Sequence, residues 1–246
     1  GGEWAGAVTL ATEHAPKGEE GHYGSLPQLG SPIGSLVGSG AFLALGLMPT
    51  EVFDSWGWRI PFLAAFPLLL IALWMRVIVE ESPKFEQSSK LGETYKKPVL
   101  EVIKREPGGL FAAAALAFVS IGGFFLVTTF AISYGTGTIG LDRNVMLTAT
   151  LTASVLQICT VIITGKIANR VPPIKLAFIG LWTTVVLAVP AIMMLSSGSP
   201  VLAILAIVMI VQPIAMAYAV TGVILPVDGG LEMRSLMPWQ TPRPTA

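Results

Sequence analysis

Charged residues are scarce in this sequence, and that scarcity excludes an ordinary soluble domain. Only 12% of the 246 residues are Asp, Glu, Lys or Arg, whereas 53% are hydrophobic. A soluble domain usually carries about 25% charged residues. The apolar residues form blocks of about 20, the length that a helix needs to cross ~30 Å of hydrocarbon. The blocks lack the alternation of a membrane β-barrel, and helices satisfy their own backbone hydrogen bonds. We therefore predict an all-α, polytopic membrane helix bundle.

Metal-ligating and redox-active residues are also rare. Cys159 is the only cysteine and lies inside an apolar block, so an internal disulfide is excluded. His14 and His22 are the only histidines, and both lie in a polar loop where a solvated surface role is expected. Lys plus Arg equals Asp plus Glu, so net charge gives no argument for nucleic acid. The sequence predicts no cofactor, no metal and no nucleic-acid partner.

The hydrophobic blocks predict about seven helices. The first block, residues 1–12, is too short to span a membrane and lacks an initiator Met, so we expect the chain to begin inside a helix. The longest polar segment, residues 80–109, is the clearest boundary. The remaining blocks cover residues 26–48, 60–79, 110–132, 145–164, 174–195 and 201–224.

Lys and Arg predict the orientation, because they concentrate in cytoplasmic loops. If the connections alternate sides, the loops at 13–23, 80–109 and 165–175 share one side. That side holds Lys17, Arg76, Lys84, Lys90, Lys96, Lys97, Lys104, Arg105, Lys166, Arg170 and Lys175. The other side has only Arg59 and Arg143, beside Trp56 and Trp58. The first side is therefore expected to be cytoplasmic.

Short motifs at the ends of the early blocks add a more specific signal. They read Gly1-Gly-Glu-Trp-Ala-Gly-Ala7, Glu13-His-Ala-Pro-Lys17, Tyr23-Gly-Ser-Leu-Pro-Gln-Leu-Gly30, Ser55-Trp-Gly-Trp-Arg-Ile-Pro-Phe62 and Glu80-Glu-Ser-Pro-Lys-Phe85. These motifs resemble helices four to six, with their loops, of the major facilitator superfamily, more narrowly its metabolite:proton symporter branch. The resemblance covers roughly residues 1–215.

The resemblance implies a domain organisation. Residues 1–79 would be the end of the N-terminal transmembrane half, residues 80–109 the central cytoplasmic loop, and residues 110–220 the start of the C-terminal half. The chain would then be a fragment that holds about helices four to ten of a twelve-helix fold. Residues 221–246 form an atypical tail.

The loop after the expected eighth helix departs from the family pattern. That pattern resembles Gly-x-x-x-Asp-Arg-x-Gly-Arg, whereas here Asn169 replaces the acid, Arg170 is kept and Pro172 stands in place of Gly. We expect Asn169 and Arg170 to form the gating loop. Asn can cap a helix or accept hydrogen bonds, but it cannot form a charged latch.

Glu3 is the only carboxylate inside an apolar block. An intramembrane acid usually faces a cavity or a partner, and desolvation raises the proton affinity of a carboxylate. Glu3 is therefore a candidate proton carrier. The alternative is a structural Glu that pairs with an Arg or with backbone of another helix. Trp4 is a candidate for the cavity wall, with ordinary packing as its alternative.

Buried amides are the next candidates for the substrate or proton pathway. Gln28, Gln157 and Gln212 lie in or beside predicted spans, where each amide holds substrate or links two helices. Thr128, Thr129 and Tyr134 lie near the outer half of the expected seventh helix, which this superfamily uses for gating. For the two threonines, a hydrogen bond back to the same helix is the alternative.

Small residues mark one face of the expected fifth helix. Gly30, Gly34 and Gly38 repeat at every fourth position, a pattern that lets another helix approach closely.

The end of the chain suggests an enzyme, and other residues argue against one. Thr221-Gly-Val-Ile-Leu-Pro-Val-Asp-Gly-Gly-Leu231 weakly resembles the C-terminus of a short-chain dehydrogenase. Such enzymes need a Tyr-x-x-x-Lys pair, and none of the four tyrosines provides one. The Gly34-x-x-x-Gly38-x-Gly40 spacing lies inside an apolar helix, without the turn that cradles phosphate. We therefore predict that the chain is not an enzyme.

The resemblance implies a secondary active transporter in a bacterial inner membrane. It would carry a small polar metabolite, such as an organic acid or compatible solute, together with protons by alternating access. Its partners would be that solute, protons and membrane lipids, and it would work as a monomer when full length. The alternatives are a sugar-type facilitator without proton coupling and a nonfunctional truncated or fused fragment.

Overall fold

The computed structural model describes residues 2–78, 107–108, 111, 114–115 and 118–224. These residues form helices and turns, which confirms the all-α prediction. The first group of helices is α1 (Gly2–Glu13), α2 (Glu20–Ser25), η1 (Leu26–Leu29), α3 (Gly30–Leu45), α4 (Thr50–Ser55), η2 (Gly57–Arg59) and α5 (Ile60–Ile78). The second group is η3 (Phe118–Gly122), α9 (Gly123–Gly137), α10 (Arg143–Ala168), α11 (Pro173–Ser196) and α12 (Pro200–Ile224).

Four helices are long and apolar enough to cross a membrane. They contain the segments 57–74, 143–168, 173–196 and 200–221. α3 has 16 residues, but α2 and the 3₁₀ segment η1 lead into it without a break in helical backbone. These four helices match the hydrophobic blocks predicted at 60–79, 145–164, 174–195 and 201–224, whereas α9 (Gly123–Gly137) ends five residues beyond the block at 110–132. The expected central loop at 80–109 and the tail at 221–246 lie almost wholly outside the described residues.

The start of α10 shows why its bounds differ from the hydrophobic block at 145–164. The carboxylate of Asp142 accepts a hydrogen bond from the backbone N–H of Asn144 at 2.7 Å. Such an N-cap satisfies one of the donors that a helix leaves free at its start. α10 therefore begins at Arg143, before its apolar residues do.

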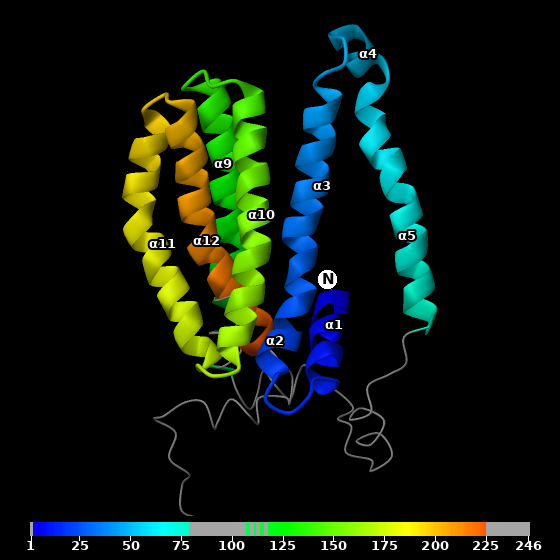
Figure 1. The fold of residues 1–246 in the computed structure, drawn as a ribbon, viewed down its shortest axis with the longest axis vertical. Coiled ribbons are helices and arrows are strands. Elements are labelled where there is room, and N and C mark those ends of the chain that lie inside the picture. Colours follow the sequence, from blue (N-terminus) through cyan, green and yellow to red (C-terminus); the bar gives the residue numbers. More distant parts are fainter. Residues whose placement is uncertain (1, 79–106, 109–110, 112–113, 116–117, 225–246) are drawn as a thin grey trace, which may run out of the picture.

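The helices α9 to α12 form a bundle in which α12 takes the central place (Figure 1). Small and branched apolar side chains, together with Met146, make its core, and Met146, Ala149, Ala203 and Ala215 are completely buried. Small side chains allow close approach of helices, which is how membrane helices pack where lipid removes the hydrophobic driving force. α12 therefore anchors the second half of the chain.

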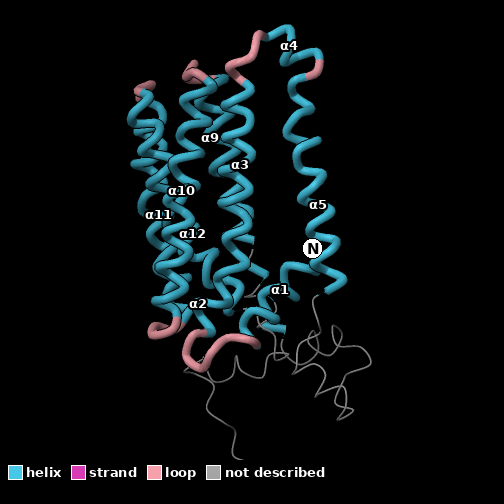
Figure 2. Tube along the Cα trace, turned by 45° about the vertical axis from the view of Figure 1, so that its right-hand side comes forward, coloured by secondary structure: helices cyan, strands magenta, loops and turns pink. Residues whose placement is uncertain are grey.

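The first part of the chain is looser (Figures 1 and 2). α3 runs beside α10, whereas α5 lies apart from the bundle in both views and is joined to α3 through α4. α1 lies beside α2 at the lower end. The connections at 14–19 and 169–172 share this lower end, as the alternation of loops predicts.

The glycine face of α3 does not meet a helix within the described residues. A Cβ built at Gly30, Gly34 or Gly38 has no atom of another segment within 4 Å. The predicted close approach is therefore absent from the described part of the chain. α3 instead contacts α10 through its other side, near Gly40 and Leu151.

Candidate functional site

Glu3 and Trp4 lie in the first turn of α1, which confirms only that they belong to a helix. Their side chains lie outside the described part of the structure. The proposed proton role of Glu3 and the cavity role of Trp4 therefore stay predictions.

Gln212 links two helices in the middle of the bundle. Its Oε1 accepts a hydrogen bond from Thr160 Oγ1 at 2.7 Å, and its Nε2 donates to the Ala153 carbonyl at 3.2 Å. Gln212 is on α12, whereas Ala153 and Thr160 are on α10. Of the two interpretations of this amide, the geometry favours the helix link, because both ends of the amide are occupied by α10.

Gln157 lies on α10 between the two residues that hold Gln212, and its own environment is different. Its side chain is 2% exposed, and its Oε1 accepts no hydrogen bond from the described residues. An unpaired buried polar group costs about 1–3 kcal/mol. The Gln157 oxygen is therefore a buried acceptor that a donor group of a ligand or water would satisfy.

Gln28 reaches the same interior from the first part of the chain. It lies in η1, which packs against α10, and its side chain is completely buried. The structure thus places Gln28 and Gln157 on two packed segments from opposite predicted halves. This placement fits either a ligand contact or a link between the halves.

The three candidates on α9 separate into different environments. Thr128 Oγ1 donates to the Phe124 carbonyl at 2.8 Å, so its hydroxyl is bonded back to its own helix. Thr129 is exposed. Tyr134 Oη lies 3.3 Å from Ser196 Oγ, and the Phe130 ring stacks on the Tyr134 ring with centroids 5.3 Å apart. Tyr134 therefore joins α9 to the end of α11.

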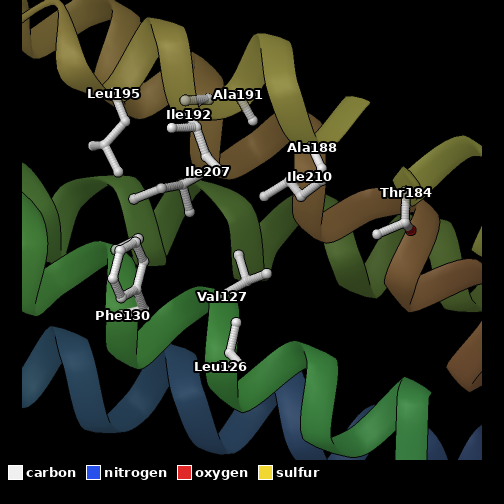
Figure 3. Close-up of a pocket in the computed structure, with 12 residues that line it drawn as sticks. Leu126, Val127, Phe130, Thr184, Ala188, Ala191, Ile192, Leu195, Ile207 and Ile210 are labelled. Atoms are coloured by element: carbon white, nitrogen blue, oxygen red, sulfur yellow. The ribbon is translucent and has the colours of Figure 1, made fainter. Parts of the chain in front are cut away.

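An apolar pocket of about 280 Å³ lies between α9, α11 and α12 (Figure 3). Its walls are aliphatic side chains with Phe130, and Thr184 is its one hydroxyl group. That hydroxyl already donates to the Gly180 carbonyl at 2.9 Å. Among the described residues, the wall of this pocket therefore offers no free polar group to a polar solute. The hydrophobic blocks gave no signal for it, because it depends on which side chains of three helices converge.

The two predicted halves meet at the lower end of the molecule. The backbone N–H of His22 in α2 donates to Asn169 Oδ1 at 2.9 Å. A Cβ at Gly21 would lie 2.8 Å from that oxygen, and a Cβ at Gly165 would overlap Ser25 Oγ. Both positions need glycine because the backbones approach so closely. Asn169 does cap a helix, as its side chain allows, and the helix it caps belongs to the other half.

Arg170 follows Asn169 but behaves differently. It is exposed and forms no ion pair with the described residues. The structure therefore places Asn169 inside the contact of the halves and Arg170 at its edge.

Comparison with known families matches residues 1–228 to the Major Facilitator Superfamily. The chain belongs to the Major Facilitator Superfamily. The match continues past residue 215, where the resemblance was expected to end, and includes the first residues of the tail. Membership also makes it an integral membrane protein and confirms the prediction that it is not an enzyme, since the relatives that follow are transporters.

Three relatives show how this superfamily member compares with known transporters. It is 39% identical over 173 residues to the shikimate transporter of Escherichia coli K12, covering 69% of this chain and 40% of the relative. It is 32% identical over 232 residues to the inner membrane metabolite transport protein YhjE of the same strain, covering 92% of this chain and 53% of the relative. It is 27% identical over 210 residues to that strain's proline/betaine transporter, covering 80% of this chain and 42% of the relative.

The chain of this superfamily member thus spans 40 to 53% of the length of these relatives. No solved structure matches it.

Proposed function

We propose that this chain works as part of a secondary active transporter that moves a small polar metabolite with protons across a bacterial inner membrane. Superfamily membership supports the transporter class. The names of the relatives, which include shikimate and proline/betaine transporters, favour organic acids or compatible solutes as substrates. In this proposal, residues 1–79 and 110–220 belong to two halves joined by residues 80–109, and the protein works as a monomer when full length.

The observation that carries the proposal is the buried oxygen of Gln157. It lies on α10, a helix long and apolar enough to cross a membrane, against which η1 also packs, and it lacks a donor among the described residues. A hydroxyl or an N–H of a polar solute would provide that donor. Gln28 lies on η1, which packs against α10, so a solute held between η1 and α10 would contact both proposed halves, as alternating access requires.

The lower contact supplies a second part of the mechanism. Asn169 and His22 hold the two halves together at the expected cytoplasmic end. Opening toward the cytoplasm would break that hydrogen bond and separate Gly21 and Gly165 from their neighbours.

Glu3 is proposed to carry the proton, with a purely structural ion pair as its alternative. Trp4, Thr129 and Tyr134 complete the proposed pathway, and Gln212 and Thr128 act in it as positioning residues.

Uptake by the natural protein that carries this sequence tests the proposal. The protein is reconstituted into vesicles, and accumulation of radiolabelled shikimate, proline or betaine is followed with and without an imposed proton gradient. Accumulation above the external concentration only with the gradient supports symport. Equal uptake in both conditions would favour a facilitator without proton coupling. Absence of all uptake, for a protein that is folded in the vesicles, would favour a nonfunctional fragment.

A further inference from the structure

A cavity of about 700 Å³ with both polar and apolar walls opens beside the contact of α2 with the end of α10, at the lower end of the molecule (Figure 1). Both halves contribute to its wall. Gly18, Glu19 and His22 come from the loop before α2 and from α2 itself, and the other lining residues come from the last turns of α10 and the residues after it. The cavity is separate from the buried Gln157 oxygen and from the apolar pocket between α9, α11 and α12.

The charges of the cavity favour a singly charged anion. Lys166 and Arg170 line it, and neither forms an ion pair within the part of the chain that the structure describes. Glu19 is the one carboxylate on the wall. Two cations and one carboxylate leave a net charge of +1, with His22 counted as neutral. A phosphodiester carries the matching single negative charge, and Arg and Lys both bind phosphate oxygens well.

His22 adds a neutral hydrogen-bonding group to this wall. Its backbone N–H is used by Asn169, but its ring Nδ1 is buried and has no hydrogen-bond partner among the described residues. A ring nitrogen donates in one tautomer and accepts in the other. Because Nδ1 is buried, it reaches a phosphate oxygen only when the His22 ring turns toward the cavity, and in its donor tautomer it would then donate to that oxygen.

Two large apolar side chains of the wall come from α10. Ile163 and Ile167 lie on α10 next to Lys166 and Arg170, and they are 56% and 42% exposed. α10 is long and apolar enough to cross a membrane over Arg143–Ala168, which would put its last turns where hydrocarbon gives way to headgroups. A ligand that fits both parts of the wall has a phosphate at one end and a hydrocarbon chain at the other.

We propose that this cavity binds the phosphate group of an anionic membrane lipid, with the lipid chains along Ile163 and Ile167. Basic pockets between transmembrane helices on the cytoplasmic side are suited to such headgroups. The lipid would touch α2 and α10 together and so stabilise the His22–Asn169 contact. The proposal that the cavity binds lipid does not depend on the proposed transport function. Any effect of the lipid on transport would depend on it.

The test measures lipid binding directly, with the full 246-residue chain in detergent. Native mass spectrometry compares retention of phosphatidylglycerol with retention of phosphatidylcholine, whose choline cation cancels the phosphate charge. Lys166→Gln combined with Arg170→Gln removes both cations of the cavity. Lys175→Gln is the matched control, because Lys175 is an exposed cation at the start of α11 that does not line the cavity. Circular dichroism verifies that every variant keeps its helices.

We expect the wild-type chain to retain phosphatidylglycerol over phosphatidylcholine. The double variant should lose about thirtyfold in affinity, since each cation near a headgroup contributes about fivefold, and Lys175→Gln should bind as the wild type does. Equal retention of both lipids, or an equal loss in the control, would overturn the proposal. Displacement of the lipid by inorganic phosphate at equal concentration would also overturn it, because the site would then belong to a free anion.

Discussion

His22 and Asn169 are joined by a hydrogen bond of 2.9 Å across 147 residues of sequence. The donor is the backbone N–H of His22, in the first turn of α2. The acceptor is the side-chain oxygen of Asn169, the residue directly after the end of α10. An N-cap usually comes from the residue just before the helix. Here the residue that follows α10 provides it, so the stability of α2 is coupled to the contact between α2 and the end of α10.

Asn169→Ala should destabilise the chain by about 1 kcal/mol, the usual cost of losing an N-cap. Thermal unfolding in detergent, followed by circular dichroism, measures the effect. Asn169→Asp is the control, because it keeps an acceptor oxygen. Its loss should be smaller than that of Ala, because the carboxylate keeps an acceptor and the two cations on the cavity wall, Lys166 and Arg170, outnumber Glu19. Equal stability of wild type and Asn169→Ala would show that the hydrogen bond does not hold α2.

Gly165→Ala should destabilise the chain by about 1–3 kcal/mol through overpacking, because the new methyl group overlaps Ser25. Gly137→Ala is the matched control, since it lies at the end of α9 with no neighbouring atom within 4 Å. Thermal unfolding again measures both. Ser25→Gly should restore much of the stability lost in Gly165→Ala. If both glycine variants lose the same stability, the close approach of α2 and α10 is not the cause.

Gln212→Leu and Thr160→Val should be coupled in a double-mutant cycle. Side-chain hydrogen bonds between membrane helices contribute about 0.6 kcal/mol on average, so the pair should show a coupling energy of about that size. Each single variant lowers stability, and the double variant loses less than the sum. A coupling energy of zero in unfolding experiments would mean that the two groups do not interact in the membrane.

Gln157→Leu should not lower stability, unlike Gln212→Leu and Thr160→Val. It removes a buried oxygen that no described residue satisfies, so the unfolding temperature should stay the same or rise. Solute uptake by the natural protein should fall by about tenfold or more, since a lost hydrogen bond to substrate is worth about 1–3 kcal/mol. Gln212→Leu is the comparison, with lower stability as its main effect. Wild-type uptake in a folded Gln157→Leu protein would remove Gln157 from the pathway.

The sequence was sufficient for the parts of the fold that depend on local composition. Apolar blocks long enough to span a membrane predict α5, α10, α11 and α12. Lys17, Lys166 and Lys175 predict which loops share an end. The polar residues that matter most could be listed as candidates, because a Gln or a Glu inside a hydrophobic block is rare and expensive.

The roles of these residues could not be separated in the same way. Gln157 and Gln212 look alike in the sequence, and they differ only because Thr160 and Ala153 satisfy one of them. That Asn169 can cap a helix follows from its side chain. That its partner is His22 depends on how two distant segments pack, which the sequence does not state. The cavity between the loop before α2 and the end of α10 could not be predicted either, because it too depends on how distant segments pack.

The contact at Gly21 and Gly165 has a mechanical consequence. α2 and the end of α10 meet through glycine backbone, without long side chains that interlock. They can therefore separate without a change of side-chain rotamers. Opening the lower end would break the His22–Asn169 hydrogen bond and part the closely packed backbone at Gly21 and Gly165. A change of a single side chain there would shift the ratio of open to closed molecules severalfold without altering the rest of the bundle.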